Sequence, residues 1–84
     1  MHYVYILKSL KDYKLYIGYS SDLKQRVEDH INGRVESTRN RRPLELIYYE
    51  ACKSDFDAKG REWQLKKFGR AYSQLKKRIS KSIE

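Results

Sequence analysis

The segments Tyr3-Val4-Tyr5 and Tyr16-Ile17-Gly18, followed by Arg26 and His30, decide the fold of this chain. The two tyrosine-centred segments predict two strands, and the polar residues 9–14 between them form a connection of hairpin length. Arg26 and His30 are four residues apart in the helical pattern that follows, so their side chains lie on one face of a helix. We expect both to point toward the sheet, and the rest of the chain to complete the site that they begin.

The first strand is predicted over residues 1–8, with apolar or aromatic side chains on both of its faces. That pattern indicates a central strand covered on both sides. A second strand is expected at residues 15–19 and a third at 44–50. Gly18, near the end of the second strand, indicates the close approach of another backbone or of a ligand.

A first helix begins at a cluster of N-cap candidates, residues 20–22, and Gln25 stands three residues after Asp22, as in a capping box. Gly33 ends this helix. Its predicted apolar stripe consists of Leu23, Val27 and Ile31. The arginine and the histidine named above lie along the edge of that stripe, which allows both to face the sheet.

A second helix is predicted over residues 55–68, where Gly69 stops it. Ala58, Glu62 and Leu65 share one face of this helix, at spacings of four and three residues. The Glu62 carboxylate therefore lies on an otherwise inward-looking stripe, and a charge in such a place requires a partner.

The remaining segments complete a single small domain over residues 1–84. Residues 34–42 are expected to form an arginine-rich loop that Pro43 closes, and a third helix is predicted over residues 72–83. The element order is ββαβαα. It predicts an α/β (α+β) fold, with a small, mostly antiparallel three-stranded sheet flanked by helices.

The composition favours a polyanionic partner. Nineteen lysines and arginines against eleven acidic residues give a formal net charge of +8, and cations that bind phosphates release condensed counterions. Cys52 is the only cysteine and forms no internal disulfide, so we expect a reducing, cytoplasmic location and a packing role for its thiol. No signal peptide and no segment able to span a bilayer is predicted, so no membrane association is expected.

These residues together resemble the GIY-YIG nuclease family. The resemblance covers nearly the whole chain, and the sequence is most similar to single-domain bacterial members, which are related to the N-terminal domain of an excinuclease. A lone Tyr-Ile-Gly is common by chance. The ordered set is specific, because Arg26 follows Tyr16 by ten residues and His30 lies one turn beyond. One departure is that Tyr3 stands where the family signature has a glycine.

The resemblance implies a three-stranded antiparallel sheet flanked by helices and metal-dependent cleavage of DNA phosphodiester bonds. Tyr5 and Tyr16 would lie beside the scissile phosphate, with one of them helping to deprotonate the attacking water. Arg26 would stabilise the developing charge on the phosphate, and His30 would assist proton transfer or position a catalytic tyrosine. Glu62 would bind a single divalent ion, Mg²⁺ or Mn²⁺.

Physical chemistry makes these roles plausible and leaves alternatives open. A tyrosine of ordinary pKa, about 10, is a poor base at neutral pH, but a nearby cation favours its phenolate. Which tyrosine acts as the base stays open. Magnesium keeps much of its hydration shell, so one carboxylate is enough for a site. Glu62 could instead be a structural carboxylate paired with Arg61 or Lys66.

The basic loop is the predicted contact with the nucleic-acid backbone. The residues assigned to phosphate contacts are Thr38, Arg39, Arg41 and Arg42. The alternative is a solvated run of charge. Lys76-Lys77-Arg78 is expected to be a solvated helix face that adds non-specific attraction, and Trp63 is expected to pack.

The sequence thus predicts a metal-dependent DNA endonuclease linked to DNA repair or processing, with RNA not excluded as a substrate. A domain of this size has little surface for reading a long sequence, so we expect selection by shape, nicks, flaps or single strands. The main alternative is a non-catalytic, basic nucleic-acid-binding module of the same fold. A third interpretation is a domain that docks on a repair-protein partner. The oligomeric state is left open.

Overall fold

A computed structural model of residues 1–84 contains three strands and five helices. In chain order these are β1 (His2–Ser9), β2 (Leu15–Ser20), α1 (Leu23–Ile31), α2 (Glu36–Arg39), β3 (Leu44–Cys52), α3 (Asp55–Lys66), α4 (Arg70–Arg78) and α5 (Ser80–Ile83). The predicted order of the main elements is confirmed. Two differences are that the expected loop contains the short helix α2, and that the expected third helix is divided into α4 and α5.

The sheet is antiparallel with the order β2-β1-β3, so β1 is central, as its sequence predicted. Four consecutive β1 residues, Val4 to Leu7, are at most 1% exposed because both faces of the strand are covered. The register between β1 and β3 shifts between Ile6 and Leu7, where β3 carries one extra residue.

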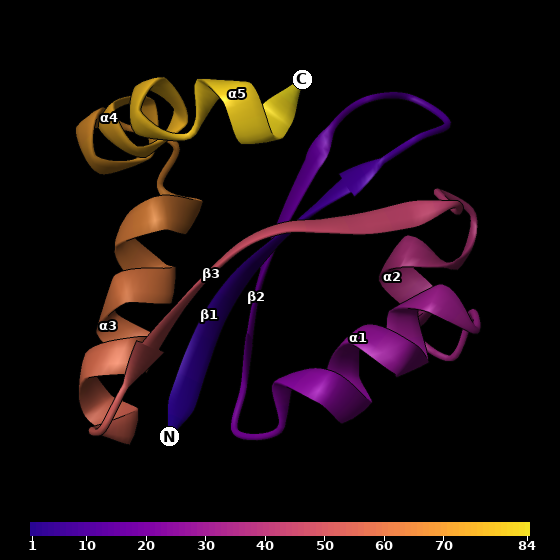
Figure 1. The fold of residues 1–84 in the computed structure, drawn as a ribbon. Helices are drawn as coiled ribbons and strands as arrows, with labels where there is room; N and C mark the ends of the chain where they lie inside the picture. Colours follow the sequence, from indigo (N-terminus) through magenta and orange to yellow (C-terminus); the bar gives the residue numbers. More distant parts are fainter.

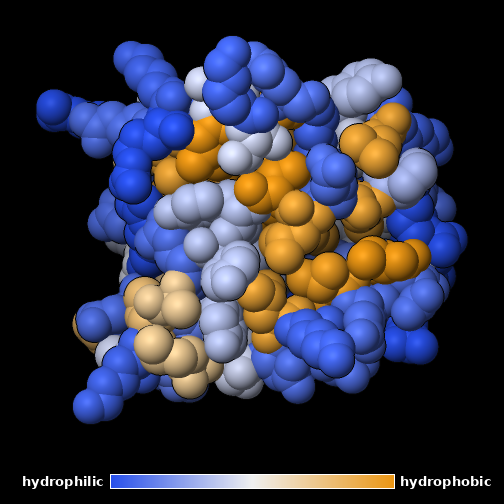
Figure 2. Space-filling view, in the orientation of Figure 1, coloured by the Kyte–Doolittle hydropathy of each residue, from blue (hydrophilic) through white to orange (hydrophobic).

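Helices cover the two faces of the sheet separately (Figure 1): α1 and α2 lie on one side and α3 on the other, while α4 and α5 cross one end. The larger core lies under α3 and α4 and consists of Val4, Ile6, Ile17, Ala58, Leu65 and Leu75. The smaller core lies under α1 and consists of Tyr5, Leu7 and Leu44. Burying each large side chain contributes about 1.5–3 kcal/mol. Apolar residues show at the surface mainly between β3 and the helices α1 and α2 (Figure 2).

The start of α1 follows the prediction, and its buried face does not. Asp22 caps the helix by accepting a hydrogen bond from the Gln25 backbone N–H at 3.2 Å, while the Gln25 side chain bonds to Asp29 rather than closing a capping box. Ile31, which we expected in the apolar stripe, is 52% exposed. His30 is buried in its place, so the inward face is rotated toward the polar residue.

The other differences also concern side-chain burial. α2 forms because Val35 and Thr38 both face inward, which anchors a segment that is otherwise polar. α4 ends at Ile79, whose backbone leaves the helical region while its side chain packs on the larger core. Trp63 is 60% exposed, so the expectation that it packs was wrong. No helix of the structure is long and apolar enough to cross a bilayer.

Candidate active site

Tyr5 is the centre of the site, and Gly18 makes its position possible. The two residues are cross-strand partners on β1 and β2, and Tyr5 is fully buried. A Cβ atom at Gly18 would collide with the outer half of the Tyr5 ring and would lie 2.8 Å from its Cε2 atom. A close approach at Gly18 is therefore observed, but the group that approaches is the Tyr5 side chain, which lies across β2, and not the backbone or ligand that we expected.

A chain of buried hydrogen bonds continues from Tyr5 through His30. The Tyr5 hydroxyl lies 2.8 Å from His30 Nε2, and His30 Nδ1 lies 2.7 Å from the Thr38 hydroxyl. None of the three side chains is exposed. They come from β1, α1 and α2, so the short helix α2 has a clear role: it supplies the group that holds the second ring nitrogen of His30.

The position of Thr38 corrects one sequence prediction. Thr38 was expected to contact a phosphate backbone, but its hydroxyl is buried and bonded to His30. A buried hydroxyl is out of reach of a bound nucleic acid, so that expectation was wrong for Thr38. Instead it fixes the histidine ring.

His30 is neutral at pH 7. Its burial, and then the nearby charge of Arg26, lower the His30 pKa to about 4. A neutral imidazole has one N–H donor and one acceptor nitrogen. His30 therefore accepts from one hydroxyl and donates to the other, and the proton can be carried on either ring nitrogen without a charge appearing in the core.

The two tyrosines of the site have different surroundings. Tyr16 packs edge-on against His30, with ring centroids 5.1 Å apart, and its ring lies 6.4 Å from that of Tyr5. Burial raises the pKa of Tyr5 to about 12, although Arg26 opposes this. Tyr16 is partly exposed, and its hydroxyl makes no hydrogen bond within the protein. Of the two hydroxyls, that of Tyr16 is the one available to a bound water or substrate.

Arg26 is the cation of the site. It lies on α1 one turn before His30 and is only partly buried. The Tyr5 hydroxyl raises the pKa of Arg26 further, and the Tyr16 hydroxyl acts in the same direction. The guanidinium therefore interacts electrostatically with both tyrosines while retaining access to solvent, which suits a group that binds an anion.

Glu62 approaches from α3, on the other side of the sheet. It is partly buried, and its charge acts on Tyr5, contributing to the raised pKa of that group. Lys66 pairs with it at 3.0 Å, which agrees with one of the two structural alternatives. The other does not occur, because Arg61 pairs with Glu50.

A single carboxylate, that of Glu62, suits a hydrated hard cation better than a metal that needs several protein ligands. No three His, Cys, Asp or Glu side chains form a metal-binding group anywhere in the structure. One carboxylate with waters and substrate oxygens suits Mg²⁺ or Mn²⁺. A cation at Glu62 must compete with the ammonium of Lys66.

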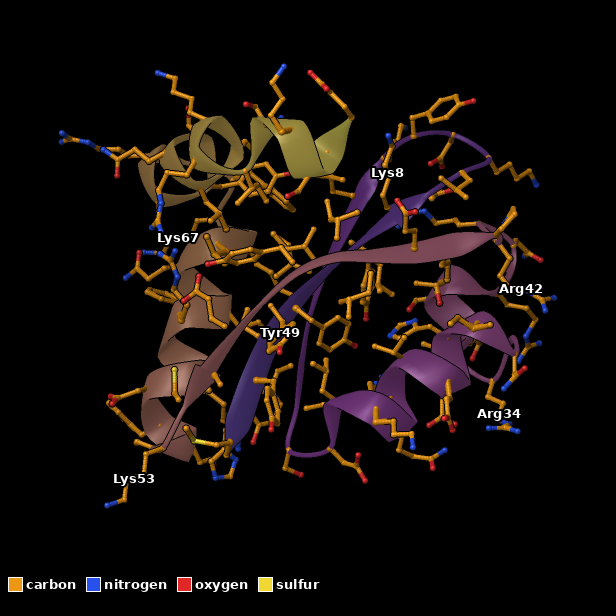
Figure 3. The ribbon with its side chains drawn as sticks, in the orientation of Figure 1. Lys8, Arg34, Arg42, Tyr49, Lys53 and Lys67 are labelled. Carbon is orange, nitrogen blue, oxygen red and sulfur yellow. The ribbon has the colours of Figure 1, made fainter.

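Three of the four arginines of the basic loop were assigned to phosphate contacts, and they make no hydrogen bond or ion pair with Tyr5, His30 or Glu62. Arg39 donates its Nε–H to the Gly33 carbonyl and Arg42 donates its own to the Arg39 carbonyl, both at 3.0 Å. Both are exposed, and Arg42 lies beside α2 (Figure 3) with its guanidinium over Gly33. Arg41 is partly buried and lies 3.6 Å from Asp12. Arg39 and Arg42 keep free N–H donors for an anion, while Arg41 is partly engaged.

Sequence reasoning missed the role of one neighbour of the site, Thr38, and anticipated the other, Lys66. Thr38 was noticed only as part of the basic loop, and nothing in its spacing from His30 distinguishes a partner from a surface residue. Lys66 was considered only as an ion pair. Its position four residues after Glu62 is the signal for the contact observed.

Comparison with known proteins gives consistent results. Residues 1–77 match the family described as the GIY-YIG catalytic domain. The chain is 41% identical over 85 residues to a UPF0213 protein of Clostridium perfringens, covering 100% of this chain and 89% of that protein. It is 41% identical over 70 residues to a UPF0213 protein of Staphylococcus saprophyticus, covering 82% and 84%. The solution NMR structure of a UPF0213 protein from Bacillus halodurans is similar with a TM-score of 0.54, at 35% identity, covering 88% of this chain and 79% of that one.

Proposed function

Because the chain belongs to the GIY-YIG family, we propose that it is a DNA endonuclease that hydrolyses phosphodiester bonds with a divalent metal ion, as one domain over residues 1–84. The observation that carries this proposal is a cluster in which Tyr5 is hydrogen-bonded to the buried, neutral His30 and Tyr16 packs on the same ring, with the partly exposed Arg26 one helical turn away. A purely structural cluster gains nothing from leaving that cation accessible. A site for an anionic transition state requires it.

We assign the general base to Tyr16. Its hydroxyl is free of protein partners and reaches solvent, whereas the Tyr5 hydroxyl is committed to His30. A phenol with a pKa near 12 is also the weaker candidate, because almost none of it is ionised at neutral pH. Tyr16 would take the proton of the attacking water, and Tyr5 would hold the position of Arg26 and His30.

Arg26 would stabilise the negative charge that develops on the phosphate oxygens. Its planar guanidinium offers several N–H donors in a fixed geometry, which suits a phosphoryl group. His30 would keep the Tyr5 hydroxyl oriented through its own bond to Thr38. A neutral ring does this without repelling the nearby guanidinium, which agrees with the lowered pKa of His30.

Glu62 is the residue that would hold Mg²⁺ or Mn²⁺. When bound, such an ion neutralises charge on the reacting phosphate. Lys66 then has to release the carboxylate and becomes a second cation beside the substrate. The Glu62 carboxylate then has a positive counter-charge both without the metal ion, from Lys66, and with it, from the ion.

The substrate is proposed to be DNA that is selected by structure, such as a nick, flap or single strand, in repair or processing; RNA is not excluded. Arg39, Arg41 and Arg42 would contact backbone phosphates beside the site, with Arg41 first leaving Asp12. Backbone contacts position a nucleic acid without reading its sequence.

The proposed location is a reducing cytoplasm, since the single cysteine, Cys52, is partly buried and free. A repair-protein partner is compatible with the proposed nuclease role.

The test is cleavage of labelled duplex, single-stranded, nicked, flapped and branched DNA with Mg²⁺, Mn²⁺ or a chelator. Tyr16→Phe, Arg26→Ala and Glu62→Ala are assayed beside the unmodified protein. We expect cutting that requires metal and disappears in all three variants while DNA binding persists. Cutting that survives all three substitutions would point to a contaminating nuclease and end the proposal.

A non-catalytic nucleic-acid-binding module is the second candidate. The ion pair between Glu62 and Lys66 favours it, because the carboxylate is already satisfied without a metal. The net charge of +8 would then serve binding alone. Binding that weakens steeply with salt, with no turnover on any substrate, would support this alternative.

A further inference from the structure

A hollow of about 490 Å³ lies where α3 passes into α4, outside the candidate active site. It is lined by Phe68, Tyr72, Ser73, Lys76, Lys77 and Ser80. Two of these residues are aromatic, two are lysines and two are serines, while none is acidic. This combination differs from the apolar lining expected where helices only pack on one another.

The two rings of the hollow leave surface open for stacking. Phe68 and Tyr72 meet edge to face, with centroids 5.1 Å apart and planes at 85°. Phe68 is 64% exposed, so most of its ring has no partner in the protein. A nucleic-acid base stacks well on such a ring whatever its sequence, because every base has a π-face.

The backbone at Phe68 is held in an unfavourable conformation. Its φ angle is +55°, in the left-handed region that bulky side chains rarely adopt. The neighbouring Gly69 has a φ of −96°, so the residue best suited to a positive φ stands one place later. Burial does not compensate for this strain, because the ring is exposed. Strained residues cluster at functional sites, and this one also ends α3, since a left-handed residue commonly follows the last residues of a helix.

Cations surround the rings. The Nζ atom of Lys76 lies 5.2 Å from the centre of the Tyr72 ring, and Lys77 lines the same hollow. Lys67 directly precedes Phe68 in the chain, and its Nζ atom lies 3.6 Å from the centre of the Trp63 ring. Figure 3 shows Lys67 at the corner between α3 and α4. Neither lysine of the hollow has an acidic partner. An anion is therefore the ligand that their chemistry suits.

We propose that this hollow binds one nucleotide unit, an aromatic base carrying a phosphate. The base would stack on Phe68 and Tyr72, while Lys76 and Lys77 would bind the phosphate. An apolar segment of a protein partner would cover the rings but leave both ammonium groups without a counter-charge, which is unfavourable. A nucleotide satisfies the rings and the lysines together.

The source of the nucleotide follows from the place of the hollow in the chain. Phe68 comes six residues after Glu62 and two residues after Lys66, where α3 ends, and the helical part of this separation rises about 6 Å at about 1.5 Å per residue. A strand whose phosphate lies at Glu62 can therefore reach the hollow with a neighbouring unpaired nucleotide. This step rests on the proposed function. It implies a preference for unpaired DNA, because stacking within a duplex covers the faces of its bases.

The test measures binding in a chelator, so that no cleavage interferes. Labelled single-stranded DNA, the same strand with abasic residues and a duplex are titrated against the unmodified protein and Phe68→Ala. Phe68→Ala should weaken binding of the single strand by about 5- to 100-fold and leave the abasic strand within about 2-fold. Phe56→Ala is the matched control, since Phe56 is 84% exposed on α3 and lies outside the hollow.

Two further arms keep the outcome clear. Phe68→Gly relieves the positive φ, so it should unfold at the same or a higher temperature and still lose binding, which separates the ring from folding. Titration with a free nucleoside monophosphate distinguishes the sources: saturation at micromolar concentration would indicate a free nucleotide as the ligand and would overturn the strand proposal. Unchanged single-strand binding in Phe68→Ala would overturn the site itself, even if cleavage is observed. If the unmodified protein cleaves no DNA but its single-strand binding depends on Phe68, only the proposed function would be refuted.

Discussion

Replacing Gly18 with alanine tests whether the Tyr5 ring holds the site together. A Cβ atom at position 18 would meet the Tyr5 ring at well under van der Waals distance, so the ring has to move. Overpacking of a buried site costs about 1–3 kcal/mol. Moving the ring also breaks the bond between the Tyr5 hydroxyl and His30, worth about 1 kcal/mol.

We therefore expect Gly18→Ala to lower the free energy of unfolding by about 2–4 kcal/mol. Urea denaturation followed by circular dichroism measures this loss. Gly60→Ala is the matched control: no atom lies within 4 Å of a Cβ at that position, and the exposed glycine is inside α3. The control should gain up to about 1 kcal/mol, because alanine favours the helix. Equal stability of Gly18→Ala and the unmodified protein would refute the packing of Tyr5 over Gly18.

Three further predictions concern the groups around this ring. Thr38→Val leaves His30 Nδ1 buried without a partner and should lower the free energy of unfolding by about 1–3 kcal/mol; a loss below about 0.5 kcal/mol by urea denaturation would contradict the chain of hydrogen bonds. The His30 pKa is about 4 in the folded state against 6.5 in the unfolded state, so the unfolded state binds more protons between these two pH values. The free energy of unfolding should therefore fall by up to about 3 kcal/mol as the pH drops from 6.5 to 4, and His30→Gln should lose this part of the pH dependence. An NMR titration that finds the ring protonating near pH 6.5 would refute its burial. Lys66→Gln frees the Glu62 carboxylate and should lower the Mg²⁺ or Mn²⁺ concentration needed for half-maximal binding several-fold, measured by calorimetry; weaker metal binding would contradict competition at that carboxylate.

The strands were predictable because their information is local. Apolar residues on both faces of β1 indicate a central strand, and the structure has it between β2 and β3. Gly18 predicted a close approach, which is observed, but the sequence suggested a backbone or a ligand, and only the fold could identify the Tyr5 side chain as the approaching group. Arg26 and His30 were expected to face the sheet because of their spacing, and both do so to differing degrees.

The buried polar contacts were not predictable, because they depend on partners distant in the sequence. His30 and Ile31 are adjacent, and hydrophobicity alone places the isoleucine inward. The histidine is buried instead because Tyr5 and Thr38 satisfy both of its ring nitrogens. The same contact explains why a polar segment forms α2. The exposure of Trp63 was missed because helical spacing gives a face and does not say what covers it.

The central claim is that Tyr16, Arg26 and Glu62 form a hydrolytic site. Its most direct test is single-turnover cleavage of one labelled flap DNA in Mg²⁺ by the unmodified protein, Tyr16→Phe and Tyr5→Phe, each at saturating protein. We predict that Tyr16→Phe abolishes cleavage at every pH while DNA binding is unchanged, and that Tyr5→Phe retains measurable cleavage, because its hydroxyl only positions Arg26 and His30. Full cleavage by Tyr16→Phe would contradict the account, since it would remove the base on which the proposed hydrolysis depends.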